Sequence, residues 1–131
     1  MSALPPPARQ LIDGQLVAAS DGATYPILNP ADGTEIGVAP DGTAADVDAA
    51  IAAARRAFDE SDWSTDRDLR VRCLRQLHAA LLANADAFKA LTTAEVGMPG
   101  FMMMAAGFDV PVDGLKWVTD LLESYDFESD L

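Results

Sequence analysis

Two side chains are the first candidates for chemistry: the single cysteine, Cys73, and the single histidine, His78. A nucleophilic thiol needs a depressed pKa and an adjacent base. On a helix, a spacing of five residues places the side chains of Cys73 and His78 on different faces. Cys73 lies between Leu69 and Leu77 on one apolar face. Because free cysteine is usually buried, core packing is favoured over a nucleophile. The face of His78 carries no second histidine or carboxylate at metal-ligand spacing, so we interpret it as a boundary histidine.

Charged and sulfur-containing groups offer weaker candidates. Six of the nine basic residues alternate with acids: Arg55, Arg56, Arg67, Arg70, Arg72 and Arg75. This pattern is typical of a solvated helix surface with ion pairs, and an anion site is the alternative. Met98 and Met102–Met104 suit a soft metal, but three consecutive methionines cannot all face one ion on a helix. Core packing or a pliable pocket is therefore favoured for them. The sequence has no glycine-rich phosphate loop and no calcium-loop spacing.

Composition limits the class of protein. The chain has 131 residues and a net charge of −12, and half of its residues are hydrophobic. This predicts one domain or part of one, with nucleic acid and membrane surfaces as poor partners. One cysteine cannot form an internal disulfide, and the start of the chain lacks a signal-peptide pattern, so a cytoplasmic location is expected. Residues 1–9, with Pro5–Pro7, are expected to form a disordered tail.

Two β-hairpins are predicted after this tail. The first is Gln10–Val17, where Asp13-Gly14 supplies the positive φ angles of a type I′ turn. The second is Tyr25–Pro40, with a turn that ends on Gly33. Pro26 cannot donate to a ladder, so its strand is expected at a sheet edge. The resulting small antiparallel sheet needs a covering element.

Four or five helices are predicted to follow. Thr43 and Asp46 resemble a capping box, and the first helix then carries an apolar stripe that is expected to cover the sheet. Its members are Val47, Ile51, Ala54 and Phe58. Thr65 and Asp68 repeat the capping signal before a second helix. The face of that helix expected to be buried consists of Leu69, Cys73, Leu77, Ala80 and Leu81.

The second half of the chain is expected to be helical as well. Asn84 is predicted to cap a third helix, which Gly97 and Pro99 end. Phe101–Ala106 is expected to form a short helical segment, and Val110-Pro111 to start the last helix. The buried face of that helix is predicted to consist of Val112, Leu115, Val118 and Leu122. The fold class is therefore α+β, with two N-terminal hairpins and then helices.

An ordered series of short motifs runs through this framework. It consists of Ile12-Asp13-Gly14, Asn29-Pro30 with Gly33, Asp46–Ile51 with Ala57-Phe58, Trp63, Glu95-Val96-Gly97-Met98-Pro99, and Leu115-Lys116-Trp117. Each motif alone is unspecific. Their order and spacing resemble the N-terminal segment of the NAD(P)-dependent aldehyde dehydrogenase superfamily, over nearly the whole chain past the tail.

The resemblance implies a scaffold role. Residues 10–131 would be the first part of a Rossmann-like α/β coenzyme domain. The family oxidises aldehydes to carboxylates through a thiohemiacetal on a cysteine, hydride transfer to NAD or NADP, and thioester hydrolysis. The family's nucleophilic cysteine, general-base glutamate, oxyanion-hole asparagine and most coenzyme-binding residues lie beyond this segment. No catalytic or cofactor-binding residue is therefore assigned here, and no NAD or NADP binding by this chain alone is expected.

The resemblance also implies two weaker sites. The backbone carbonyls of Ile27 and Leu28, with the acid Glu95, correspond to a structural site for a monovalent cation. Ala106 and Val110 correspond to positions near the mouth of the substrate tunnel. For both sites, a plain loop or core role is the alternative.

Two functions from different classes follow. The first hypothesis is an N-terminal fragment of an aldehyde dehydrogenase from a truncated or divided gene, inactive by itself, whose partner is the remainder of the dehydrogenase fold. The second is a non-catalytic interaction module that docks on full-length dehydrogenase subunits. An acidic carrier protein, a third option, does not explain two hairpins specified by their turns.

Overall fold

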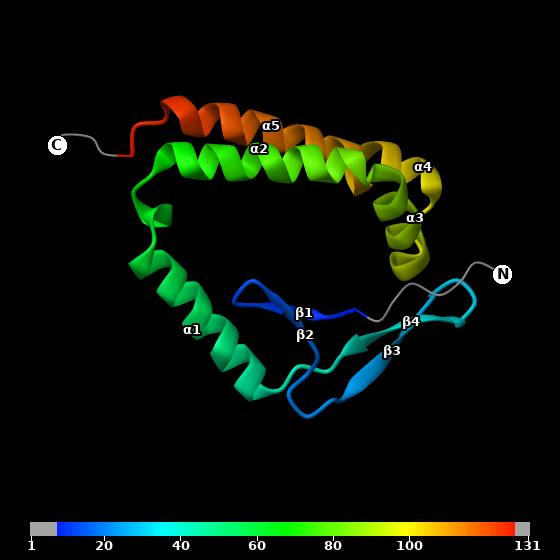
Figure 1. Ribbon diagram of the computed structural model, residues 1–131. Helices are drawn as coiled ribbons and strands as arrows, with labels where there is room; N and C mark the ends of the chain where they lie inside the picture. The colour runs from blue at the N-terminus through cyan, green and yellow to red at the C-terminus, as the bar shows by residue number, and fades with distance from the viewer. Residues whose placement is uncertain (1–7, 128–131) are drawn as a thin grey trace. The chain divides into compact units, whose positions relative to one another are not determined.

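The computed structural model describes residues 8–127, which fold as two antiparallel hairpins followed by helices (Figure 1). The predicted α+β class is confirmed. The expected tail, residues 1–9, lies mostly outside the described residues. Contacts divide the chain into two compact units. Unit 1 is the described part of Met1–Ser61 together with Ala94–Gly97, and unit 2 is Asp62–Thr93 together with the described part of Met98–Leu131.

The first hairpin of unit 1 follows from its turn residues. Strand β1 (Gln10–Ile12) pairs antiparallel with β2 (Gln15–Val17). Asp13 and Gly14 have φ angles of 53° and 73°. Two consecutive positive φ angles are the signature of a type I′ turn, so the predicted turn type is confirmed.

The second hairpin joins β3 (Thr24–Leu28) to β4 (Glu35–Pro40). Each hairpin is a separate two-stranded sheet, so Pro26 lies on an edge strand as predicted. In the turn, the Asn29 side chain accepts a hydrogen bond from the backbone N–H of Ala31, and Gly33 has a φ of 73°. The register shifts between Ile27 and Leu28, which marks a β-bulge that interrupts the ladder.

Helix α1 (Ala44–Glu60) begins with the predicted capping box of Thr43 and Asp46. The Thr43 hydroxyl accepts from the Asp46 N–H at 3.2 Å, and the Asp46 carboxylate accepts from the Thr43 N–H at 2.9 Å. The same carboxylate accepts the Ser20 N–H at 3.1 Å and the Ser20 hydroxyl at 3.3 Å. A buried Asp46 therefore ties the loop after β2 to the start of the helix.

The expectation that the large apolar stripe of α1 covers the sheet is wrong. The helix meets β1 through a face of small residues that line a groove with the first hairpin: Ala50, Ala53, Ala57 and, from the predicted stripe, Ala54. Val47 and Ile51 are 54% and 62% exposed, and Phe58 is about half exposed. Small side chains let the hairpin backbone approach closely, so the bulky stripe points elsewhere.

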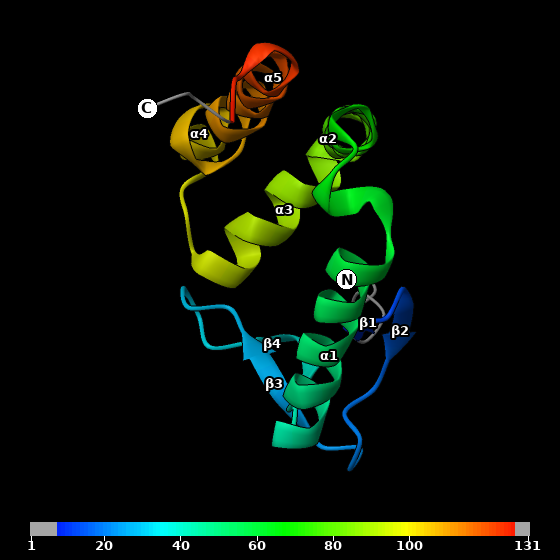
Figure 2. The ribbon, with the colours of Figure 1, turned by 90° about the vertical axis from the view of Figure 1, so that its left-hand side faces the viewer.

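Unit 2 is built on an antiparallel pair, α2 (Arg67–Ala83) and α5 (Asp109–Ser124), which run side by side in Figures 1 and 2. A short 3₁₀ turn, η1 (Asp62–Ser64), precedes α2. The predicted cap at Thr65 is wrong by one residue. Asp66 is the N-cap, and its carboxylate accepts from the Leu69 N–H at 2.8 Å.

Asn84 separates α2 from α3 (Ala85–Val96) but does not act as predicted. Its side-chain amide donates to the Ala80 carbonyl at 2.8 Å, so it caps the end of α2, while its backbone carbonyl accepts from the Phe88 N–H. Gly97 ends α3 with a φ of 67°, as its position predicts. Within residues 8–127, every helix is too short or too polar to cross a membrane.

Unit 2 has a small hydrophobic core formed around the segment that joins α3 to α5. The chain passes through α4 (Gly100–Met102) and a π-helical turn, η2 (Met103–Gly107), so the predicted short helical segment is present. Met103, Phe108 and Val112 are buried together, with Leu81 and Met98 against them. The predicted buried face of α5 is wrong at Val118, which is exposed. Thr119 is buried instead and donates to the Leu115 carbonyl.

Acid should loosen unit 1 through Asp46. Hydrogen bonds from Thr43 and Ser20 lower the pKa of this carboxyl from 3.8 to about 2. A depressed pKa means that the charged form is favoured by folding, so its stabilisation is complete above pH 3.8 and disappears as pH falls through 2. Asp46→Asn should remove this pH dependence, as measured by urea unfolding between about pH 2 and 5.

Asp48→Asn on the same helix is the matched control, because Asp48 is exposed. An Asp46→Asn protein that keeps the wild-type acid profile would contradict the assignment. Thr43→Ala should cost about 1 kcal/mol at neutral pH, the usual loss for an N-cap.

Candidate functional site

The segments that carry the predicted cation ligands lie in one unit. Ile27 and Leu28 lie on the strand opposite the bulge, whose extra residue is Ile36 of β4. Glu95 is in the last turn of α3, which is the part of that helix assigned to unit 1. The two segments meet at Gly97, where a Cβ atom would lie 2.8 Å from Cγ of Pro30. Only glycine allows this approach with a φ of 67°. The N-P and E-x-G-x-P motifs therefore share one corner of the fold.

This corner has the donor chemistry of a hard cation site. Glu95 is exposed, with no ion pair to residues 8–127. Oxygen ligands of this kind suit a cation that prefers carbonyl and carboxylate groups. In the described part of the chain, no three His, Cys, Asp or Glu side chains cluster as a metal site. The cation site at Ile27, Leu28 and Glu95 therefore stays a prediction.

The predicted tunnel residues lie on either side of a helix break in unit 2. Ala106 is in η2, and Val110 is in the first turn of α5. Between them Phe108 has φ −146° and ψ −58°, which prevents one continuous helix. Both side chains are exposed, Val110 by 61%. They form an open apolar surface, which is compatible with lining a passage once another segment covers it.

Cys73 and His78 are not brought together. Cys73 is half-buried, and Val71 is the buried residue of α2. His78 turns toward α5, where it lines a cavity of about 300 Å³ with Arg75, Lys116, Thr119 and Asp120. Its Nε2 is buried and has no hydrogen-bond partner among the described residues. Sequence spacing missed this group because its members come from two helices that are far apart in the chain.

Most of the arginine group forms the predicted surface ion pairs. Arg55 pairs with Asp59 one turn along α1, and Arg56 lies 2.9 Å from Asp13. Arg75 pairs with Glu123, which links α2 to α5. Such exposed pairs contribute about 0–1 kcal/mol each. With Arg72, which lies 4.0 Å from Asp66, four of the six arginines lie near a carboxylate.

The larger feature of both units is uncovered apolar surface. On unit 1, Leu11 and Leu16 of the first hairpin are exposed along with the α1 stripe. On unit 2, Trp117 is 67% exposed, and further exposed side chains include Phe101, Met104, Val110, Val118 and Leu121. Exposed bulky apolar side chains in this number are typical of an interaction surface.

Comparisons with known proteins agree with the motif order. The sequence matches the aldehyde dehydrogenase family over residues 16–129. It is 35% identical to 3-succinoylsemialdehyde-pyridine dehydrogenase of a Pseudomonas species and 37% identical to aminoaldehyde dehydrogenase 2 of Solanum lycopersicum. Each match covers 92% of this chain, but only 25% and 24% of the relatives. The chain thus spans about a quarter of their length.

A solved structure shows the same arrangement. An aldehyde dehydrogenase of Mycobacterium tuberculosis, complexed with NAD⁺, superposes with a TM-score of 0.85 at 27% identity. The match covers 94% of this chain and 26% of that one. The hairpins and helices described above are therefore a recurring part of a larger fold.

Gly97→Ala tests the corner between the two motifs. A side chain at this positive φ costs about 1–2 kcal/mol, and its contact with Pro30 adds to that. We expect a lower midpoint of thermal unfolding. Gly100→Ala is the control because no atom lies within 4 Å of its Cβ position and its φ is not positive. Equal stability of the two variants would contradict the close approach.

Proposed function

Because this chain belongs to the aldehyde dehydrogenase family, we propose that it forms the first part of a dehydrogenase coenzyme domain and serves as scaffold. The reaction of the whole fold is the NAD- or NADP-dependent oxidation of an aldehyde to a carboxylate. This segment supplies packing surfaces for the rest of that fold. By itself it is catalytically inactive and holds neither coenzyme. Its cytoplasmic location and the division into tail and partial domain stay predictions.

The exposed bulky side chains carry this proposal. Ile51 belongs to the apolar stripe of α1, and Trp117 is a large aromatic residue of α5, yet they are 62% and 67% exposed. Burial of such a side chain stabilises a protein by roughly 1.5–3 kcal/mol. A chain with several of them uncovered gains most of its stability only when a further apolar surface packs on them. The remaining three quarters of the dehydrogenase fold is the surface that the relatives possess.

The cation corner and the tunnel residues take secondary roles in this proposal. A monovalent cation held by the carbonyls of Ile27 and Leu28 and by Glu95 would join β3 to the end of α3. Ala106 and Val110 would form part of the tunnel wall after the remaining fold covers them. The close approach of Gly97 to Pro30 supports the first assignment, and the exposure of Ala106 and Val110 supports the second.

The second candidate is a module that docks on complete dehydrogenase subunits, and the same exposed faces favour it. Coexpression separates the two functions. A scaffold segment should copurify with a relative that lacks its own matching first quarter, and not with the complete relative. A docking module should copurify with the complete subunit.

The purified 131-residue chain should show no NAD- or NADP-dependent aldehyde oxidation and should bind a hydrophobic dye strongly. Dye binding reports the uncovered apolar faces. Measurable aldehyde turnover by the chain alone would contradict the scaffold function. So would a monomer that melts cooperatively and binds no dye.

The Ile51→Lys variant distinguishes the stability of the isolated chain from its assembly with the rest of the dehydrogenase fold. Because Ile51 is 62% exposed, the substitution should change the stability of the isolated chain by no more than about 0.5 kcal/mol. It should nevertheless abolish copurification with the truncated relative, because burial of a charged lysine in an apolar contact costs free energy. Ala52→Lys, also exposed on α1, is the control and should keep copurification. Retained assembly of the Ile51→Lys variant would exclude this face as a contact.

Glu95→Gln tests the cation corner. Potassium should raise the unfolding midpoint of the wild-type chain more than tetramethylammonium does at the same ionic strength, and the variant should lose that difference. Equal ionic strength removes general screening from the comparison. Glu60→Gln, at the end of α1, is the control. No difference between the two cations for the wild type would rule out the site.

A further inference from the structure

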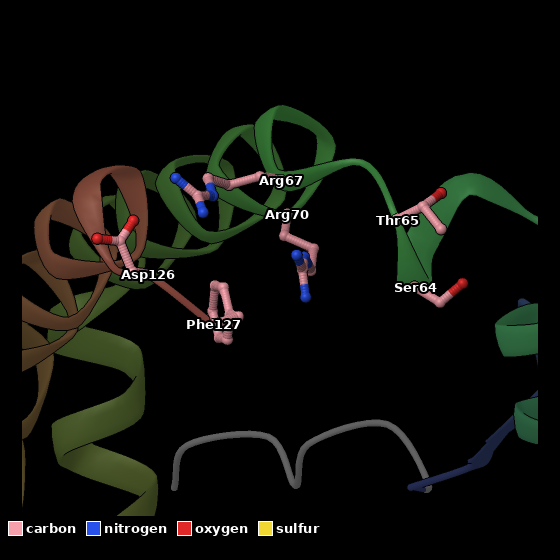
Figure 3. A pocket seen from close by; sticks show the side chains of 6 residues that line it. All are labelled: Ser64, Thr65, Arg67, Arg70, Asp126 and Phe127. Atoms are coloured by element: carbon pink, nitrogen blue, oxygen red, sulfur yellow. The ribbon is translucent and has the colours of Figure 1, made fainter. Parts of the chain in front are cut away.

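One end of the α2–α5 pair contains an open cavity of about 580 Å³. Figure 3 shows its lining, which comes from the turn before α2, the first turns of α2 and the residues after α5. The lining residues are Ser64, Thr65, Arg67, Arg70, Asp126 and Phe127. All belong to unit 2. The cavity therefore combines two guanidinium groups, two hydroxyl groups, one carboxylate and one aromatic ring.

Arg67 has a structural task. Its two terminal nitrogens donate to the carbonyls of Glu123 at 3.1 Å and of Tyr125 at 2.8 Å. These carbonyls lie at the C-terminal end of α5, where a helix leaves its acceptors unpaired and favours positive charge. Its guanidinium also lies 5.6 Å from the centre of the Phe127 ring. Arg67 thus holds the end of α5 and the aromatic wall of the cavity.

Arg70 has no such partner. Within residues 8–127 its guanidinium makes no hydrogen bond and no ion pair, and its Nε is shielded from solvent. Its carbon Cζ lies 5.5 Å from the centre of the Phe127 ring, which holds the side chain from one side. Figure 3 shows the group between Phe127 and the turn with Ser64 and Thr65. A desolvated donor without an acceptor costs stability, so an acceptor that fits is bound favourably.

We propose that this cavity binds a carboxylate group, which Arg70 holds with two parallel N–H donors. The planar guanidinium fork matches the two oxygens of a carboxylate. A phosphate dianion is disfavoured because Asp126 is in the lining and the chain carries a charge of −12. Arg67 directs two of its five N–H donors to the carbonyls of Glu123 and Tyr125, so Arg70 is the arginine left to meet the ligand.

The carboxylate comes from an aspartate or glutamate side chain of a polypeptide packed over this end. An apolar hollow of about 200 Å³ adjoins the cavity and shares Phe127 with it, lined also by Val118, Leu121, Leu122 and Tyr125. An acidic side chain with an apolar neighbour fills both hollows, whereas a free small carboxylate fills one. This source rests on the proposed function, since the remaining dehydrogenase fold would supply the segment.

Acetate titration of the full chain tests the site. We expect a saturable shift of one arginine Nε–Hε signal in nitrogen–proton spectra, with millimolar affinity. Arg70→Lys keeps the charge and loses the fork, so binding should weaken about tenfold. Arg72→Lys on the same helix is the control and should bind as the wild type does, because Arg72 lies at the exposed surface, 4.0 Å from Asp66. Circular dichroism checks that both variants keep their helices.

The absence of a saturable shift, or equal weakening in both variants, would overturn the site. A capped aspartyl-leucine peptide then identifies the source. It should bind about tenfold more tightly than acetate because the leucine side chain enters the adjoining hollow. Equal affinity for the two probes would overturn the polypeptide source. These titrations use the chain alone, so a failed copurification contradicts the scaffold function without deciding this site.

Discussion

Burial of apolar surface is the constraint on which the rest of this structure depends. A domain is stable only when hydrophobic side chains leave water in sufficient number to offset the loss of chain entropy. Here unit 2 closes a small core around Met103, Phe108 and Val112, and α1 of unit 1 buries little more than Ala53. The bulky stripes of both units stay in water. This shortage of buried apolar surface is the basis of the proposed scaffold function.

Because little apolar surface is buried, contacts at the ends of helices and strands define the local geometry. The carboxylate of Asp46 accepts hydrogen bonds from backbone and hydroxyl donors at the start of α1. The guanidinium of Arg67 donates to the carbonyls at the end of α5. Gly97 brings the end of α3 against Pro30. The contacts of Asp46 and Arg67 satisfy groups that a helix terminus leaves unpaired, whereas the contact of Gly97 is a close apolar approach. These contacts are local and directional, so they can fix where elements begin and end without a large core.

The sequence predicts those features that short-range chemistry decides. Asp13-Gly14 requires two positive φ angles and therefore one turn type, and Thr43 with Asp46 specifies the start of α1. Which face of a helix is buried depends on the element that packs against it. The predicted contact of Ile51 with the hairpin is wrong because alanines of α1 pack there instead. Arg70 could not be singled out from its five neighbours, because only the three-dimensional arrangement shows which arginine lacks an acceptor. Family motifs indicate the larger fold because they carry information about partners outside this segment.

The heat capacity of unfolding measures the central quantity, the apolar surface buried by this chain alone. A fully packed protein of 131 residues shows about 1.6–2.0 kcal/mol/K, at about 12–15 cal/mol/K per residue. Exposed stripes on α1 and α5 predict a calorimetric value below roughly two thirds of that range for the isolated chain. A cooperative transition with the full value would show that the 131 residues bury a complete core, and the scaffold function would be wrong.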